Sequence, residues 1–311
     1  MREGRFPGVR GLKAAGRVAG YGCLRGCLLI VPFLPLWCLL WMGRRLGELI
    51  YIASRRRRQI AMKNLSIAFG TEKPLPDRRR IAIECFRHFG MFVLEVMKFA
   101  FLGPSEAAKY LHLDPGSRGL LNEAFALNRG VIFVSAHFGN FELAARTIAE
   151  LGHPMTVVVR PARDQRTTRL MENLRRRNGI LPLLRDNAAR GMLAALRRGE
   201  AVAILADQNA TDVVVPFFGK PTGTVDGPAR LALRTGAPII VGTCRRQPDG
   251  TYWTSAAGIL YPDSVKPRED AVLRLTAEIN ELLEQAIRRN PEQWLWFHDR
   301  WRSSPVEFSS D

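Results

Sequence analysis

A histidine and a glutamate that could share a proton lie in the stretch GVIFVSAHFGNFELAARTIAEL, residues 130–151. The stretch begins with an apolar, β-branched run at residues 131–134, which predicts a buried strand, and ends with apolar residues at helical spacing over residues 141–151. His137 therefore stands at a strand-to-helix junction, where the free N–H groups of the helix N-terminus point toward it. Such a junction favours acid–base chemistry.

His137 and Glu142 are five residues apart, which on a straight helix would separate them by about 140°. They can meet only if the chain bends, as a Gly139-Asn140 loop allows. A carboxylate bonded to one ring nitrogen raises the basicity of the other, which can then take a proton from a hydroxyl. Because neither Ser135 nor any cysteine lies in a nucleophile elbow, we expect a substrate hydroxyl to attack an acyl thioester directly. The alternative is a packed histidine beside a surface glutamate.

The elements that would position these residues alternate between strands and helices. Strands are predicted at residues 131–134, 155–159, 180–184, 201–206, 238–245 and 252–260, and helices at residues 141–151, 164–177, 188–198, 227–235 and 268–289. A hairpin at Pro248-Asp249-Gly250 joins the last two strands. The pattern predicts an α/β fold with a mostly parallel central sheet, helices on both faces and an antiparallel edge.

The charge of the chain is concentrated near its beginning. Of 311 residues, 46 are Lys or Arg and 29 are Asp or Glu, which gives a net charge of +17. Residues 1–63 contain thirteen basic and two acidic side chains, a balance of +11. Because this excess flanks an apolar run, it indicates anionic lipid rather than nucleic acid as a partner. The sequence shows no zinc-finger spacing and no RNA-recognition aromatic motif.

The apolar run, residues 26–43, is eighteen residues long and carries no charge. About 20 residues are needed to cross a bilayer, and Pro32 and Pro35 would kink a helix, so we expect an anchor that either spans the membrane or is re-entrant. Residues 1–45 would form a basic N-terminus with this anchor, residues 46–302 one α/β domain, and residues 303–311 a loose tail. The run at residues 55–69 predicts a basic amphipathic helix, solvated or at lipid phosphate.

The five cysteines are Cys23, Cys27, Cys38, Cys85 and Cys244. Their number is odd, and Cys23 and Cys27 have no matching downstream pair of ligands, so we expect reduced thiols, a cytoplasm-facing domain and no zinc site. No metal site and no cofactor are predicted.

Five stretches together resemble a known family. SAHFGNFE, at residues 135–142, is similar to the H-x4-D/E signature of glycerolipid-type acyltransferases, and in particular to that of the bacterial lipid A biosynthesis acyltransferases. Four further stretches agree in order and spacing: RRRRQIAMKNLSIAFG (55–70), VVVRP (157–161), LADQN with VPFFGKPTGTVDGPARLALRTGAP (205–238), and PEQWLWFHDRWR (291–302). The resemblance covers nearly the whole chain, from about residue 44 to residue 302.

The resemblance implies a glycerolipid acyltransferase-like fold at the bacterial inner membrane, with the catalytic domain facing the cytoplasm. The enzyme would move an acyl chain from acyl carrier protein to a hydroxyacyl group of a phosphorylated lipid A precursor. His137 would act as general base, Glu142 would orient it, and backbone N–H groups near Gly139 and Asn140 would stabilise the oxyanion. Acyl carrier protein is acidic and would suit the basic surface.

Several further residues are candidates for substrate binding. Arg160 ends a predicted strand at the same sheet edge as His137, and its planar fork suits a sugar phosphate. The helix that follows carries Arg169, Arg175 and Arg177, which resemble the family's arginines but are also typical of a solvated face. Asp207 and Gln208 end another strand: Gln208 would donate to the oxyanion or hold the sugar, and Asp207 is a substrate ligand or a structural cap. The Pro- and Gly-rich loop at residues 216–228 would shape an acyl tunnel or simply connect elements.

Two other functions remain open. The enzyme could acylate another glycolipid, such as a phosphatidylinositol mannoside, because the H-x4-D/E core would look alike. A non-enzymatic basic module that binds anionic lipid or nucleic acid would explain the charge but gives SAHFGNFE no role. The sequence does not determine the acyl chain length, the acceptor position, or the choice between carrier protein and coenzyme A as donor.

Overall fold

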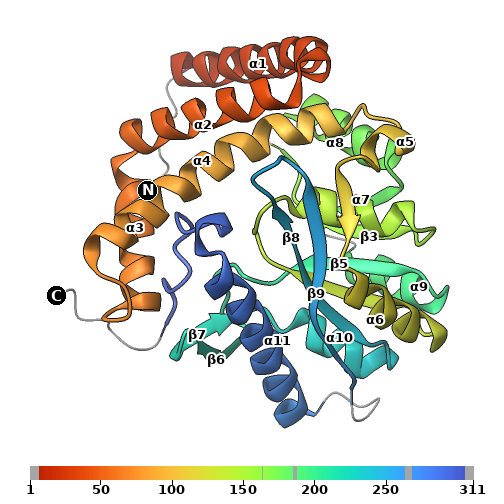
Figure 1. The fold of residues 1–311 in the computed structure, drawn as a ribbon. Helices are drawn as coiled ribbons and strands as arrows, with labels where there is room; N and C mark the ends of the chain where they lie inside the picture. Colours follow the sequence, from red (N-terminus) through yellow and green to blue (C-terminus); the bar gives the residue numbers. More distant parts are fainter. Residues whose placement is uncertain (1–6, 163, 185–187, 263–267, 305–311) are drawn as a thin grey trace.

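A seven-stranded sheet forms the centre of the molecule (Figure 1), with the strand order β1-β9-β8-β2-β5-β3-β4. The computed structural model describes residues 7–162, 164–184, 188–262 and 268–304, and within the first helix the side chains of residues 16 and 18–30. The sheet strands are β1 (Leu111–Leu113), β2 (Val131–Ser135), β3 (Met155–Val159), β4 (Ile180–Leu184), β5 (Ala201–Leu205), β8 (Ile239–Arg246) and β9 (Tyr252–Leu260). The strands from β8 to β4 run parallel, and β9 pairs antiparallel with β8. The predicted α/β sheet is confirmed.

Helices cover both faces of this sheet, because alternate residues of each buried strand point to opposite sides. On one face Ile132 and Val134 share a core with α3, α10 and α11, and on the other Val131 shares a core with α6 and α7. The helices of the sheet domain are α3 (Arg55–Phe69), α4 (Leu75–Phe99), α5 (Pro104–Ala107), α6 (Pro115–Ala126), α7 (Phe141–Glu150), α8 (Gln165–Arg177), α9 (Ala188–Arg197), α10 (Gly227–Thr235) and α11 (Glu269–Arg289).

The apolar run at residues 26–43 does not form one anchor helix, so that prediction is corrected. Helix α1 (Pro7–Ile30) ends within the run, a 3₁₀ turn follows (η1, Val31–Phe33), and α2 (Leu36–Ala53) begins after Pro35. The break has a physical cause, since a proline lacks the N–H group that a continuous helix needs. None of the described helices is long and apolar enough to cross a membrane.

Helix α2 packs on the sheet domain, because it lies directly against α4 (Figure 1). The contact is made through the backbone: a methyl group on Gly43 or Gly47 of α2, or on Gly90 of α4, would overlap main-chain atoms of the other helix. Three glycines therefore allow an approach that any larger residue would prevent. On the other side of α2, Trp37 is 73 % and Trp41 58 % exposed.

Several segments differ from the prediction. Residues 213–224 form a two-stranded antiparallel ribbon, β6 (Val213–Phe217) with β7 (Lys220–Thr224), rather than a loop. The ribbon tolerates prolines because it has no further strand to bond, and Phe218 and Gly219, both at positive φ, close the turn. The short β1 and the helices α5 and α6 were not predicted. Of the expected loose tail, residues 305–311 lie outside the described residues, and Ser303 is hydrogen-bonded to Asn209.

Candidate active site

The pairing of two neighbouring strands brings His137 and Asp207 together. In the parallel pair β2 and β5, Ser135 stands opposite Leu205, so the residues that follow both strands leave the sheet at the same edge. Nδ1 of His137 lies 2.8 Å from Oδ1 of Asp207, and the His137 backbone N–H donates to Oδ2 at 2.9 Å. Because an ionised carboxylate only accepts hydrogen bonds, Nδ1 carries the ring proton, and the lone pair of Nε2 is left to act as a base.

Asp207 is a buried carboxylate, only 3 % exposed, and its donors keep it ionised. In addition to His137, the indole Nε1 of Trp294 donates to its Oδ2 at 2.8 Å. Burial alone would raise the pKa of Asp207, but the charge of His137 and the hydrogen bonds from His137 and Trp294 lower it to about 2. Asp207 therefore carries its negative charge throughout the physiological pH range.

The environment of His137 makes it a stronger base than a free histidine. Burial would lower the pKa of His137, but the charge and hydrogen bond of Asp207, together with the charge of Glu142, raise it above its ordinary value. The ring remains reachable, since 20 % of its side-chain surface is exposed. A ring that is oriented, basic and accessible fits the role predicted for His137.

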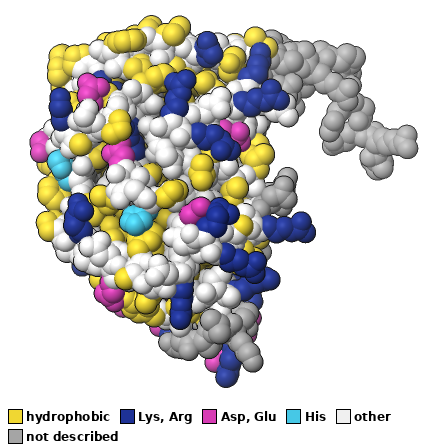
Figure 2. All heavy atoms as spheres, turned by 90° about the vertical axis from the view of Figure 1, so that its right-hand side faces the viewer, with side chains coloured by type: hydrophobic (Ala, Val, Ile, Leu, Met, Phe, Trp, Pro, Cys, Tyr) yellow, Lys and Arg dark blue, Asp and Glu magenta, His cyan; other side chains and the backbone are white. Residues whose placement is uncertain are grey.

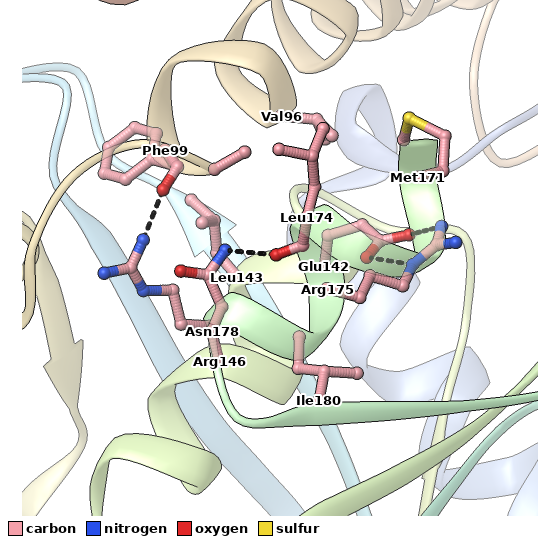
Figure 3. Close-up of a pocket in the computed structure, with 11 residues that line it drawn as sticks. Val96, Phe99, Glu142, Leu143, Arg146, Met171, Leu174, Arg175, Asn178 and Ile180 are labelled. Atoms are coloured by element: carbon pink, nitrogen blue, oxygen red, sulfur yellow. Dashed lines mark hydrogen bonds and ion pairs between the residues drawn. The ribbon is translucent and has the colours of Figure 1, made fainter. Parts of the chain in front are cut away.

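Glu142 does not make the contact that we predicted for it. Its carboxylate forms a two-pronged ion pair with the guanidinium of Arg175, with Nε of Arg175 at 3.0 Å from Oε2 (Figure 3). The orienting hydrogen bond to His137 comes from Asp207 instead. The cause is geometric. Glu142 lies in the first turn of α7, and its side chain reaches Arg175 on α8. Asp207 follows β5, which pairs with β2, the strand that leads to His137.

The loop at Gly139 and Asn140 is held by the backbone on both sides. Gly139 has a φ of +54°, and a methyl group there would overlap the carbonyl of Cys244, so only glycine fits. The N–H of Gly139 donates to the carbonyl of Gln293 at 2.9 Å, and that of Asn140 donates to Cys244 at 3.0 Å. The two N–H groups predicted to stabilise an oxyanion are therefore already engaged, and this part of the prediction is wrong.

Other donors belong to residues that line the same cavity as His137. The N–H groups of Phe141 and Glu142 are in the first turn of α7, where a helix leaves its N–H groups without intrahelical partners. The side-chain amide nitrogen of Gln208 lies 3.3 Å from Nε2 of His137. Gln208, expected at the end of a strand at this sheet edge, thus stands beside His137.

A cavity of about 730 Å³ opens beside His137 and Gln208. His137, Gln208 and Arg160 line it at the carboxyl edge of the sheet, and it extends along the sheet to Met155 and Ile240, at the starts of β3 and β8. Four residue steps from Met155 to Val159 correspond to roughly 13 Å at the rise of a strand. The cavity is thus polar at one end, apolar along its length, and of the size typical of ligand sites.

The predicted arginines do not all reach this cavity. Arg160 and Arg175 line it, and Arg160 is exposed whereas Arg175 is paired with Glu142. Arg169 and Arg177 are exposed and are not among the described residues that line the cavity. Arg177 ends α8, which spans roughly 18 Å and runs back from the carboxyl edge of the sheet. Only half of the arginine prediction is therefore compatible with binding in this cavity.

The C-terminal motif supports the site from behind. The N–H of Leu295 donates to the carbonyl of His137 at 3.1 Å, and Trp294 forms a backbone bridge with Phe138. Trp294, Trp296 and Trp301 are at most 2 % exposed, so the tryptophans of this motif belong to the core. No local pattern predicts that Trp294 binds Asp207, because the two residues are 87 positions apart in the chain.

Residues 16–303 match the family described as bacterial lipid A biosynthesis acyltransferase. The chain is 30 % identical to the lipid A biosynthesis palmitoleoyltransferase of Escherichia coli over 92 % of both chains, and 28 % identical to the lauroyltransferase of the same organism over 90 % of both. It is 24 % identical to a phosphatidylinositol mannoside acyltransferase of Mycobacterium tuberculosis, over 77 % of this chain and 75 % of that one.

The chain belongs to the bacterial lipid A biosynthesis acyltransferase family. It is accordingly an acyltransferase, and the chemistry of the site has to account for the transfer of an acyl group.

Proposed function

We propose that the chain transfers a fatty acyl group from an acyl thioester to the hydroxyl of a hydroxyacyl chain on a lipid A precursor. The observation that carries the proposal is the His137–Asp207 pair at the mouth of an apolar cavity. His137 Nε2 would remove the proton of the acceptor hydroxyl while its oxygen attacks the thioester carbonyl. The C–S bond then breaks, and the departing thiolate takes the proton from His137 to leave as a thiol.

The other residues of the site fit this reaction. The Gln208 amide and the first N–H groups of α7 would donate to the oxyanion that develops on the carbonyl. The apolar length of the cavity would hold a hydrocarbon chain, and its described lining comes from the sheet, its helices and the loops at its edge, with no residue of the β6–β7 ribbon. Glu142 would act through Arg175, by holding that guanidinium at the cavity wall.

The donor we propose is acyl carrier protein, because an acidic carrier suits a chain with a net charge of +17. A coenzyme A thioester would supply the same reacting group. The relatives that acylate phosphatidylinositol mannoside make another glycolipid the main alternative acceptor. A mass spectrum of lipid A from cells with and without this protein decides between the acceptors, since loss of one acyl chain from lipid A is expected only if lipid A is the substrate.

Arg160 is proposed to bind a phosphate of the acceptor. We expect Arg160→Ala to raise the KM for a phosphorylated acceptor by about 10–100-fold, which corresponds to the 1.5–3 kcal/mol of a charged hydrogen bond. The KM for the acyl donor should change little. Steady-state kinetics with each substrate varied in turn measures both, and Arg176→Ala, an exposed arginine at the end of α8, is the control. Equal changes in both KM values would contradict a role in acceptor binding.

We also propose that the chain works at the inner membrane, facing the cytoplasm, and that α2 lies in the membrane surface without crossing it. The buried side of α2 packs on α4, so its opposite side is the one available for lipid. That side exposes Trp37, Trp41, Leu49 and Ile52, which fall within roughly 120° of each other on the helix. Hydrophobic side chains follow the upper edge of the molecule, where α1 and α2 lie in Figure 1, and basic side chains are close by (Figure 2). This arrangement suits an anionic bilayer.

Loss of these apolar side chains is expected to weaken membrane binding. In sedimentation with vesicles that contain anionic phospholipid, Trp37→Gln/Trp41→Gln should bind at least about tenfold more weakly, since burial of one large apolar side chain contributes 1.5–3 kcal/mol. Leu49→Gln on α2 should weaken binding, whereas Leu273→Gln should not, because Leu273 is also an exposed leucine but belongs to α11, at the other end of the molecule (Figure 1). Equal binding by all variants would contradict this attachment.

A further inference from the structure

A buried ion pair lies behind the loop that carries His137. Glu95 of α4 is 0 % exposed, and the side chain of Arg246, at the end of β8, is 4 % exposed. The guanidinium binds the carboxylate through two nitrogens, with Nη2 at 2.6 Å from Oε2. Neither residue is among those that line the cavity, so neither can touch a substrate there. A buried pair of this kind is often no more stable than an apolar replacement, so its contacts with other groups have to be considered.

The carboxylate of Glu95 is also bonded to the active-site loop. Oε2 of Glu95 accepts a hydrogen bond from Nδ2 of Asn140 at 2.9 Å. The other side-chain atom of Asn140, Oδ1, accepts from the N–H of Leu143 at 3.2 Å and so caps α7. Asn140 itself is completely buried. Glu95 therefore sets the position of the residue at which the loop becomes the helix, three residues after His137.

Arg246 reaches the same loop by a second route. Its backbone N–H donates to Oε1 of Gln293 at 2.9 Å, and its carbonyl accepts from Nε2 of Gln293 at the same distance. The backbone carbonyl of Gln293 accepts the hydrogen bond from the N–H of Gly139. The residue after Gln293 is Trp294, whose indole binds Asp207. The loop and the carboxylate that orients His137 are thus both connected to one ion pair.

A neutral histidine is a further partner of Arg246, whose guanidinium also lies over the ring of Tyr252. Nδ1 of His88, on α4, is hydrogen-bonded to Nη1 of Arg246. Burial, followed by the positive charge of Arg246, holds the pKa of His88 well below its ordinary value, so that the ring accepts this hydrogen bond. His88, Asn140 and Gln293 each form a hydrogen bond to Glu95 or Arg246, and together with this ion pair they make one cluster. Such a connected, buried network is the arrangement expected of a rigid support.

We propose that the Glu95–Arg246 pair is a positioning device for acyl transfer, which holds Asn140, and through it the start of α7, in register with His137 and Asp207. The inference rests on the proposed function and adds residues that do not contact substrate. Its physical basis is that a displacement of about 1 Å at a catalytic group can lower a rate by 10²-fold. The sequence contained no sign of this cluster, because its members are separated by up to 205 residues in the chain, from His88 to Gln293.

The direct test reverses the hydrogen bond in which Asn140 donates to Glu95, by replacing Asn140 with aspartate and then Glu95 with glutamine. Asparagine and aspartate cap helices equally well, so Asn140→Asp keeps the cap of α7 but places a second carboxylate against Glu95. We expect kcat to fall by about 10–100-fold with the KM of both substrates nearly unchanged. Adding Glu95→Gln should restore most of kcat, because the new amide can donate to the new carboxylate, and that carboxylate keeps one negative charge in the cluster around Arg246. A rescue of this kind is not expected if Asn140 only stabilises the fold.

A second variant and a matched control keep the test decisive if a buried carboxylate prevents folding. Asn140→Ser also caps α7 but has no donor that reaches Glu95, and we expect kcat to fall by about tenfold. Asn280→Ser is the control, because Asn280 is about as buried and its Nδ2 donates to the carbonyl of Pro216 and to Thr224 on the β6–β7 ribbon, not to the loop. Thermal unfolding of each variant reports its stability separately from its kcat.

The outcomes separate this inference from the proposed function. A folded Asn140→Ser that lowers kcat no more than Asn280→Ser overturns the positioning role, and so does an Asn140→Asp enzyme that Glu95→Gln fails to rescue. His137→Ala is assayed alongside as the reference for the chemistry. If His137→Ala is inactive while the Asn140 variants keep full activity, only the positioning role is lost; if His137→Ala keeps full activity, the proposed mechanism itself is lost.

Discussion

His137→Ala is expected to lower the rate of acyl transfer by about 10²–10⁴-fold, the usual contribution of a positioned general base. The side chain is bonded to Asp207 and is not buried in the main core, so the truncated protein should still fold. KM values should change little, because the ring is proposed to act on the proton of the acceptor and not to hold its headgroup. The measurement is transfer from a labelled acyl thioester to a lipid acceptor, with circular dichroism as the check on folding.

Two results would contradict this mechanism. Near-normal transfer by folded His137→Ala would show that another group removes the proton. A trapped acyl-enzyme, on a serine or a cysteine, would replace direct attack with a covalent route. Cys85 and Cys244 are poor candidates, since burial raises the pKa of each thiol to about 12 and disfavours the reactive thiolate.

Asp207→Asn is expected to be almost as damaging as loss of His137, with a decrease in kcat of about 10²–10⁴-fold. The amide that replaces the carboxylate can donate to Nδ1 and so favour the tautomer in which Nε2 carries the proton and cannot act as base. The indole of Trp294 would still have an oxygen to bond, so the fold should be retained. Glu142→Gln provides the comparison: it should cost less, because Glu142 contacts Arg175 and not the ring.

Asp207→Asn is also expected to shift the pH profile of kcat/KM. In the wild type the charge of Asp207 raises the pKa of His137 above its ordinary value, and the neutral base is lost as the pH falls through that raised pKa. Without this charge, burial lowers the pKa of His137, so the residual activity of Asp207→Asn should persist to lower pH than in the wild type. The pH dependence of kcat/KM measures this. If the acidic limb of the kcat/KM profile stayed at the same pH in Asp207→Asn, or moved to higher pH, the assignment of Asp207 as the partner of His137 would be contradicted.

The double variant His137→Ala/Asp207→Asn completes the argument. Because the two residues act as one unit, it should be hardly worse than His137→Ala alone. Losses that multiply would show that Asp207 has a separate function, for example as a ligand of the substrate.

The local sequence predicted the features that depend on neighbouring residues. The β-branched runs and the helical spacing after residue 130 located the strands and helices of the sheet domain, and His137 was identified at a strand-to-helix junction. Residues 55–69 were predicted as a helix and form one with those bounds. These features follow from periodicity and propensity, which are properties of a short stretch of chain.

The break in the apolar run at residues 26–43 shows where local information was available but was weighted wrongly. Pro32 and Pro35 predict a kink in a single anchor. In the structure the two prolines instead separate two helices, because one helix ends before Pro32 and the next begins after Pro35. That α2 then packs on α4 depends on Gly90, which is 43 residues beyond Gly47, and no pattern within α2 shows it.

The sequence by itself determined the position of His137 as the candidate base, the strand ends that surround it and the family of the chain. Only the tertiary structure decided which carboxylate reaches His137, which N–H groups are free and which arginines face the cavity. The reason is that strand order is not written in the local pattern: Asp207 is the partner of His137 because β5 lies beside β2, although 70 residues separate the two side chains in the chain. Glu142, five residues from His137, is turned by α7 toward Arg175 instead.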